Sequence, residues 1–163
     1  MIIGITGGTG FIGGAIRKAA LANGDEVVLF SRREGEGRRR FSFTSPLDVC
    51  GCEGLLHLAG ESIIGLWTLE KRRKILESRV EGTRRLVEGI AAAKVKPQVL
   101  VSASAIGFYG DTGERITDEE SPAGTGFLAE VAQAWEAEAQ KAEQYGVRVV
   151  RLRIGFVLGR NGG

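Results

Sequence analysis

The sequence has few of the residues that build metal sites: two cysteines and one histidine among 163 residues. Cys50 and Cys52 lie one residue apart, and together with His57 they offer three candidate ligands without a fourth. A structural zinc site needs four ligands with converging side chains. We therefore expect no metal, and free thiols of the kind found in a reducing cytoplasm.

Long apolar runs and an excess of charge are missing as well. No segment approaches the ~18 consecutive apolar residues of a membrane span, and the start lacks the basic and apolar regions of a signal peptide. The formal net charge is only +2, so nothing demands a nucleic acid or an anionic membrane as a partner. With 43% hydrophobic and 26% charged residues, we expect one globular, cytoplasmic domain with a hydrophobic core.

Glycine, in contrast, is abundant, with 25 residues, and three of them form the most informative motif. The β-branched run Ile2–Thr6 breaks into Gly7-x-x-Gly10-x-x-Gly13, and an amphipathic segment follows at once. A strand, a glycine turn and a helix in this order are typical of a site for a dinucleotide pyrophosphate, which approaches the glycine backbone and the N-terminus of the helix. The alternative is an ordinary turn between a strand and a helix.

Apolar runs alternate with segments of helical periodicity along the whole chain. The runs predict strands at 2–6, 26–31, 54–59, 98–104 and 147–154, with a short edge strand at Phe41–Thr44. The periodic segments predict helices at 11–23, 69–93 and 127–145. These βαβ units predict an α/β fold, a Rossmann-type doubly wound parallel sheet with helices on both faces and a ligand crevice at the carboxyl ends of the strands.

The long helix predicted at 69–93 has an apolar and a basic face. The apolar residues expected to point inward are Ile75, Leu76, Val80, Leu86, Val87 and Ile90. The basic residues are interleaved with glutamates, which is typical of a solvated, ion-paired surface. Assembly into a homo-oligomer through this face is the alternative.

The end of the second predicted strand bears on the choice of cofactor. An acidic residue there would bind the ribose 2′-hydroxyl of NAD(H), but the strand ends in Ser31, Arg32 and Arg33. The guanidinium fork of arginine suits a 2′-phosphate, and Ser31 adds a hydroxyl donor. The sequence therefore favours NADP(H) over NAD(H). The alternative is that these arginines begin a solvated basic loop that continues to Arg40.

Several motifs in this order resemble the extended short-chain dehydrogenases/reductases. The matching segments are Thr6–Gly13, His57–Gly60, Val80–Thr83 and Ser102–Gly110. The fuller segments look like the atypical "epimerase family", or sugar-nucleotide-epimerase-like, subgroup; they are HLAGESI from His57, SASAIGFYGD from Ser102, GFLAEV from Gly126 and RLRIGFVLG from Arg151. The resemblance covers essentially the whole chain.

The resemblance implies a set of cofactor-binding residues. Those implied at the pyrophosphate are Gly7, Thr9, Gly10, Phe11 and Ile12, and those at the adenosine-side phosphate are Ser31 and Arg32. Those implied along the adenosine and ribose are Leu58, Ala59 and Glu61. Arg79 would face the cofactor from the long helix, and Gly155 and Phe156 follow the last strand where the chain passes the nicotinamide.

One departure from the family concerns catalysis. The usual pair is Tyr-x-x-x-Lys, but the corresponding positions hold Phe127 and Val131, which neither transfer a proton nor lower the pKa of a neighbour. Ser104 and Tyr109 are the candidate catalytic substitutes, and their alternative roles are contacts at a strand end and within a loop. His57, inside an apolar strand, is expected to be a core histidine.

Relatives continue beyond the last predicted strand, so we expect the chain to be a cofactor-binding domain, residues 1–163, without their substrate-binding segment. The leading function is that of an NADP(H)-binding oxidoreductase or epimerase-like protein. Its small-molecule substrate is unassigned, with a nucleotide sugar or a carbonyl compound as the candidate classes. A non-catalytic NADP(H)-binding sensor or interaction protein is the alternative.

Overall fold

The computed structural model of the protein describes residues 1–33, 35, 37–160 and 162. The chain runs through β1 (Ile2–Thr6), α1 (Phe11–Ala22), β2 (Glu26–Ser31), β3 (Arg38–Arg40), β4 (Gly54–His57), α2 (Leu69–Ala92), β5 (Val99–Ala105), the 3-10 turn η1 (Ile106–Tyr109), α3 (Phe127–Gln140), the 3-10 turn η2 (Lys141–Tyr145) and β6 (Arg148–Ile154). Strands and helices alternate as the sequence predicts.

The strands form one 6-stranded sheet in the order β3-β2-β1-β4-β5-β6. Every neighbouring pair is parallel, with Ile5 of β1 opposite Leu29 of β2 on one side and Leu56 of β4 on the other. The strand order reverses direction beside β1, and ligands of such sheets bind at this switch point. The predicted Rossmann-type doubly wound sheet is therefore confirmed.

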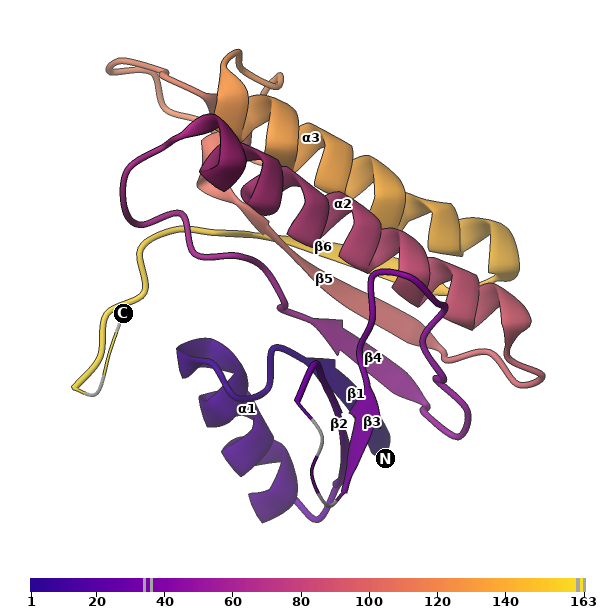
Figure 1. Ribbon diagram of the computed structural model, residues 1–163. Coiled ribbons are helices and arrows are strands. Elements are labelled where there is room, and N and C mark those ends of the chain that lie inside the picture. The colour runs from indigo at the N-terminus through magenta and orange to yellow at the C-terminus, as the bar shows by residue number, and fades with distance from the viewer. Residues whose placement is uncertain (34, 36, 161, 163) are drawn as a thin grey trace.

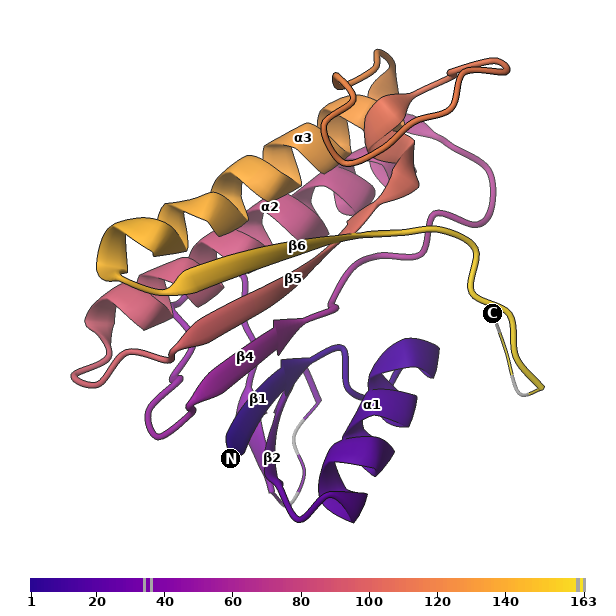
Figure 2. The same cartoon turned by 180° about the vertical axis from the view of Figure 1, so that it is seen from behind.

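Helices lie on both faces of the sheet, but they cover the two faces unequally. Figures 1 and 2 show α2 and α3 side by side on one face and α1 on the other, under β1 and β2. Figure 2 also shows β5 and β6 with no helix of the described chain over them on the side of α1. The α1 side of β5 and β6 is therefore not covered by a helix of the described chain.

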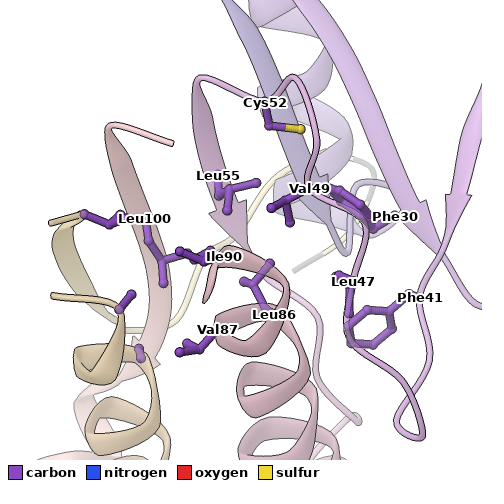
Figure 3. Packing of buried hydrophobic residues seen from close by; sticks show 13 residues of the cluster. Phe30, Phe41, Leu47, Val49, Cys52, Leu55, Leu86, Val87, Ile90 and Leu100 are labelled. Atoms are coloured by element: carbon purple, nitrogen blue, oxygen red, sulfur yellow. The ribbon is translucent and has the colours of Figure 1, made fainter. Parts of the chain in front are cut away.

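Two apolar cores bind the helices to the sheet. The larger lies under α2 and α3 and joins Leu86 and Ile90 of α2 to Leu55 and Leu100 of the strands (Figure 3). The smaller lies under α1 and consists of Ile5, Leu29 and Leu56. Central parallel strands are buried on both faces, which is why their sequences are continuous apolar runs.

Two predictions about the edges of these elements are wrong. The edge strand is Arg38–Arg40, not Phe41–Thr44, because pairing with β2 uses only backbone groups and the arginine side chains can extend into solvent. Phe41 instead places its ring in the core, where it is 5% exposed. Leu76 is 39% exposed although Ile75 is fully buried, because the next residue of a helix points about 100° away.

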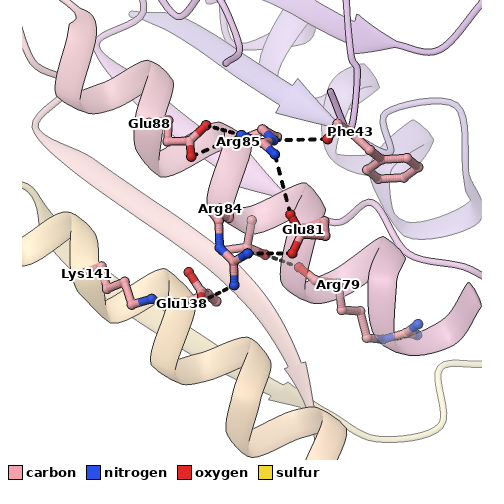
Figure 4. A network of polar contacts seen from close by, with 9 residues as sticks. Phe43, Arg79, Glu81, Arg84, Arg85, Glu88, Glu138 and Lys141 are labelled. Carbon is pink, nitrogen blue, oxygen red and sulfur yellow. Dashed lines mark hydrogen bonds and ion pairs between the residues drawn. The ribbon is translucent and has the colours of Figure 1, made fainter. Parts of the chain in front are cut away.

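The basic face of α2 is extensively ion-paired, as Figure 4 shows. Arg84 contacts Glu81 and also reaches Glu138 of α3 at 2.9 Å, while Arg85 pairs with Glu88 at 2.8 Å. One of these pairs therefore connects the two long helices. None of the helices in the described part of the chain combines the length and apolar character that a bilayer span requires.

Candidate functional site

The glycine turn between β1 and α1 has the geometry that its sequence predicts. Gly7 has a φ of 71°, and a Cβ there would lie 2.8 Å from the backbone of Leu58. A Cβ on Gly13 would clash with the carbonyl oxygen of Gly7, so glycine lets α1 start close to the turn. Gly10 precedes the helix without a capping side chain, and the first N–H groups of α1 are therefore free to bind an anion.

A cavity of about 500 Å³ opens beside this turn, at the carboxyl ends of β1, β2 and β4. We refer to it as the first cavity. It brings together most of the predicted cofactor-binding residues: Gly7, Thr9, Gly10, Ser31, Arg32, Leu58, Ala59 and Glu61. Phe11, Ile12 and Arg79 do not line it. Segments more than 50 residues apart in the sequence therefore meet at one site.

The first cavity also contains residues that the sequence alone did not identify. Arg33 and Arg38 line the cavity together with Arg32, and Phe41, Phe43 and Ser78 are also part of its wall. The rings of Phe41 and Phe43 pack edge to face with centroids 5.4 Å apart. Arg38 begins β3 and pairs with Leu29 of β2, so its place beside the cavity follows from the corrected position of β3.

The ends of β1 and β4 are held together by the hydroxyl of Thr6. The backbone N–H groups of Leu58 and Ala59 donate to Thr6 Oγ1 at 3.2 Å. Thr6 Oγ1 lies 2.7 Å from His57 Nδ1, and His57 Nε2 lies 2.9 Å from Thr83 Oγ1. This polar chain joins the glycine turn to α2 through one fully buried histidine.

His57 is a core histidine, as expected. Burial lowers the pKa of its imidazole from 6.5 to about 4, so it is neutral near pH 7. The hydroxyl of Thr83 donates to the backbone oxygen of Arg79 at 2.6 Å, which leaves Thr83 Oγ1 to accept from His57 Nε2–H. Neutral His57 then accepts at Nδ1 from Thr6, and both ring nitrogens have partners.

Glu61 links the first cavity to α2. Its carboxylate pairs with Lys71 Nζ at 2.7 Å, and this hydrogen bond lowers the pKa of the carboxyl. Its backbone N–H donates to Ser78 Oγ at 2.9 Å. A charged, paired carboxylate can accept hydrogen bonds from ribose hydroxyls but is a poor proton acceptor.

A second cavity, of about 390 Å³, lies at the carboxyl ends of β5 and β6. Its wall is largely apolar and includes Ile63, Ile106, Leu128, Val131 and Phe156. Phe156 is 95% exposed, so this apolar wall is open to solvent. The cavity has the size of a site for one aromatic ring and its substituents.

Arg79 lines the second cavity, not the first. Its Nη1 donates to the backbone oxygens of Glu61 at 3.0 Å and Ile75 at 3.2 Å. Its guanidinium carbon lies 5.1 Å from the centre of the Trp135 ring, a cation–π distance. Figure 4 shows its side chain running away from the ion pairs of Arg84 and Arg85.

The position of the usual family tyrosine is occupied by a packed aromatic ring. The guanidinium carbon of Arg72 lies 4.3 Å from the centre of the Phe127 ring, and Trp67 packs edge to face on it at 5.7 Å. Phe127 does not line the second cavity, whereas Val131, at the position of the usual lysine, does. Neither side chain can supply a proton there.

Both predicted catalytic substitutes belong to one buried ionic cluster around Glu136. Ser104 Oγ donates to Glu136 Oε1 at 2.6 Å, and Tyr109 Oη accepts from Arg153 Nη1 at 2.8 Å. Arg153 forms a two-pronged pair with Glu136, at 2.9 and 3.0 Å. Burial raises the pKa of Glu136, but the bonds from Arg153 and Ser104 outweigh it, so the pKa lies below its ordinary value.

This geometry favours structural roles for the two residues. Ser104 is only 3% exposed, and Arg153 also stacks on Phe108, with its guanidinium carbon 3.6 Å from the ring centre. The cluster thereby fixes η1, which separates the second cavity from the groove beside β6. A catalytic role for Ser104 or Tyr109 stays a prediction.

Comparison with known proteins gives the same picture over the whole chain. Residues 3–163 match the family described as "NAD dependent epimerase/dehydratase family". The chloroplastic SDR39U1 homologue of Arabidopsis thaliana is 35% identical over 100% of this chain and 51% of its own length. The epimerase family protein YfhF of Bacillus subtilis is 34% identical over 99% of this chain and 57% of its own.

A solved structure agrees with these sequence matches. The crystal structure of human epimerase family protein SDR39U1 (isoform 2) with NADPH superposes with a TM-score of 0.89 at 34% identity, over 100% of this chain and 56% of that chain. The chain thus spans about half the length of the curated relatives it matches. It belongs to the NAD dependent epimerase/dehydratase family.

Proposed function

We propose that the chain binds NADP(H) across its two cavities and takes part in hydride transfer to or from a small molecule. The proposal rests on one observation. Arg32, Arg33 and Arg38 line the same cavity as the glycine turn. A 2′-phosphate needs cations at the end of β2, where NAD(H) sites have a carboxylate. β2 ends in Ser31, whose hydroxyl accepts from the Arg33 backbone at 3.0 Å and keeps its own proton to donate.

The two cavities fit the two halves of this cofactor. The adenosine phosphate would lie against the three arginines, and the pyrophosphate would lie against Gly7, Gly10 and the start of α1, where no side chain fills the space. The nicotinamide would reach the second cavity, because dinucleotides cross from one half of such a sheet to the other at the switch point. A bound nicotinamide supplies the hydride chemistry, and the protein residues hold and orient it.

Calorimetric titration tests the proposal with NADPH and NADH on the same preparation. We expect NADPH to bind at least tenfold more tightly, and Arg32→Ala or Arg38→Ala to reduce NADPH affinity about tenfold with little change for NADH. Arg40→Ala is the matched control, because Arg40 is exposed on β3 and does not line the cavity. Equal affinities for the two cofactors would refute the 2′-phosphate site.

A non-catalytic role has its own support. Phe127 is packed between Arg72 and Trp67, and Val131 faces the cavity without a titratable group. A protein of this kind would bind NADP(H) and signal its presence to a partner. Incubation of the protein with NADPH and carbonyl compounds, and with nucleotide sugars, separates the two functions. A reductase consumes NADPH, an epimerase converts the sugar without net consumption of cofactor, and a sensor does neither.

A further inference from the structure

Arg79 is the only charged residue among those that line the second cavity. The other lining residues are apolar or glycine, with the indole of Trp135 as the second polar group. No carboxylate of the described chain lies within ion-pair distance of Arg79, and its Nη1 is bonded only to backbone oxygens. The cavity therefore has a positive charge that its own wall does not neutralise.

The surroundings of Arg79 keep this charge in place. The carboxylate of Glu61 is close enough to raise the pKa of Arg79. This carboxylate is already paired with Lys71 at 2.7 Å. Burial lowers the pKa of Arg79, which indicates that the guanidinium has lost part of its hydration. Thr83 fixes the backbone of Arg79, and the Trp135 ring lies beside the guanidinium.

We propose that Arg79 makes the second cavity selective for the charge of the nicotinamide, so that the site takes NADPH in preference to NADP⁺. This proposal rests on the proposed function, because it needs NADP(H) to bind. The reduced nicotinamide ring is neutral, whereas the oxidised ring is a pyridinium cation. A fixed cation beside the ring opposes the oxidised form alone.

The size of the effect follows from Coulomb's law. Two like charges several ångströms apart in a partly buried site repel with an energy that corresponds to a factor of about ten in affinity. The phosphates and the adenosine are the same in both forms, so they cancel in the comparison. The ratio of the two affinities therefore reports on the second cavity by itself.

A second feature favours a nicotinamide ring of either oxidation state in this cavity. The indole Nε1 of Trp135 is a buried donor without a hydrogen-bond partner in the described chain. An unpaired buried donor is unfavourable, and a ligand oxygen such as that of a carboxamide can pair with it. Arg79 and the indole N–H of Trp135 both favour a ligand with acceptor oxygens, and the charge of Arg79 opposes a cation.

A site of this kind has a consequence for both proposed functions. A reductase would load the reduced cofactor and release the oxidised product readily. In a sensor, occupancy would follow the ratio of NADPH to NADP⁺. Arg79 is a specificity-determining residue in either case.

The test is calorimetric titration of the chain, Arg79→Met and Arg79→Lys with NADPH and with NADP⁺. We expect the native chain to bind NADPH about tenfold more tightly than NADP⁺, Arg79→Met to reduce this ratio to near one, and Arg79→Lys to retain most of it. Arg73→Met is the control, because Arg73 is exposed on the same helix and pairs with Glu77. Thermal unfolding checks that each variant is folded.

The outcomes separate this proposal from the one on which it rests. If both forms bind the native chain equally, or if Arg79→Met keeps the native ratio, charge selectivity by Arg79 is refuted and the cofactor site stands. If neither form binds, the proposed function fails and the selectivity fails with it. If Arg79→Met unfolds, the native chain is compared with Arg79→Lys instead. A ratio of NADPH to NADP⁺ affinity near one in both proteins overturns the proposal.

Discussion

The first and second cavities of this protein are built in opposite ways. The first has three arginines, a glycine turn and a paired glutamate, and many of its residues lie at or just after the ends of β1, β2 and β4. The second is apolar apart from Arg79 and Trp135, and its walls come from α2, α3, η1, the ends of β5 and β6 and the chain after β6. The first is suited to hold phosphates, whereas the second selects by shape and by a single charge. The phosphate-binding and ring-binding roles proposed for the two cavities therefore rest on different residues.

The largest expected effect concerns the cluster that supports the second cavity. Glu136 is only 4% exposed and is the two-pronged partner of Arg153. Glu136→Gln removes its negative charge and leaves the Arg153 cation unpaired. We expect the free energy of unfolding in urea to fall by about 3 kcal/mol, because breaking a buried pair strands the other charge. The affinity for 2′-AMP, a probe of the first cavity, should stay within twofold.

The control for this prediction is Glu77→Gln, which removes an exposed partner of Arg73. An exposed pair contributes little, so the change should stay below about 0.5 kcal/mol. Equal losses in the two variants would show that the cluster around Glu136 adds no special support to the second cavity.

An effect of similar size is expected from His57, which lies between the two cavities. Its pKa is about 4 in the folded chain and 6.5 in the unfolded chain. Between pH 6.5 and pH 4 the unfolded chain therefore binds one proton more than the folded chain. Stability should therefore fall as the pH falls from 6.5 to 4, by up to about 3 kcal/mol. Urea titrations at several pH values measure the slope.

The chain contains a single histidine, so an NMR titration reports the pKa of His57 without ambiguity. Carboxylates with lowered pKa values, such as Glu136, lose their contribution as the pH falls below their ordinary pKa of 4.5, so their effect begins at the acid end of this window and continues below it. A folded-state pKa near 6.5 would contradict the buried, neutral histidine and the hydrogen-bond chain from Thr6 to Thr83.

The smallest effect is expected at the position of the missing tyrosine. Phe127→Tyr restores the family residue, but its ring packs against Arg72 and Trp67 and does not line the second cavity. We expect NADPH affinity within twofold, a stability change within about 0.5 kcal/mol, and no gain of NADPH oxidation with carbonyl substrates.

Leu128→Tyr is the matched comparison, because Leu128 is the next residue and does line the cavity. A larger side chain there should fill the cavity and weaken NADPH binding. Turnover gained by Phe127→Tyr would show that its ring can reach the cofactor, and the contrast between the two cavities would then need revision.

Much of the first cavity could be predicted because its residues are local to motifs. Gly7 and Gly10 follow β1, Ser31 and Arg32 end β2, and Leu58 and Ala59 follow β4. The carboxyl ends of parallel strands converge at one edge, so the order of strands and turns was enough. Arg38 was missed since its place depends on which three residues of a charged segment pair with β2.

The second cavity depends on packing that no short segment encodes. Arg79 was expected beside the cofactor, but the rotation of α2 that places it against Trp135 is set by the burial of Ile75, Leu86 and Ile90. Ser104 and Tyr109 were candidates for catalysis, and only the meeting of β5, η1, α3 and β6 shows that both belong to the cluster around Glu136.

The sequence by itself determined the parallel sheet, the glycine turn and the family, because each depends on the local order of apolar runs and turn residues. The tertiary structure decided which cavity receives each polar side chain. It also decided whether Phe127 is a possible acid position or a packed ring, and whether Arg79 is neutralised. These are questions of distance between segments remote in the chain, and side-chain packing answers them.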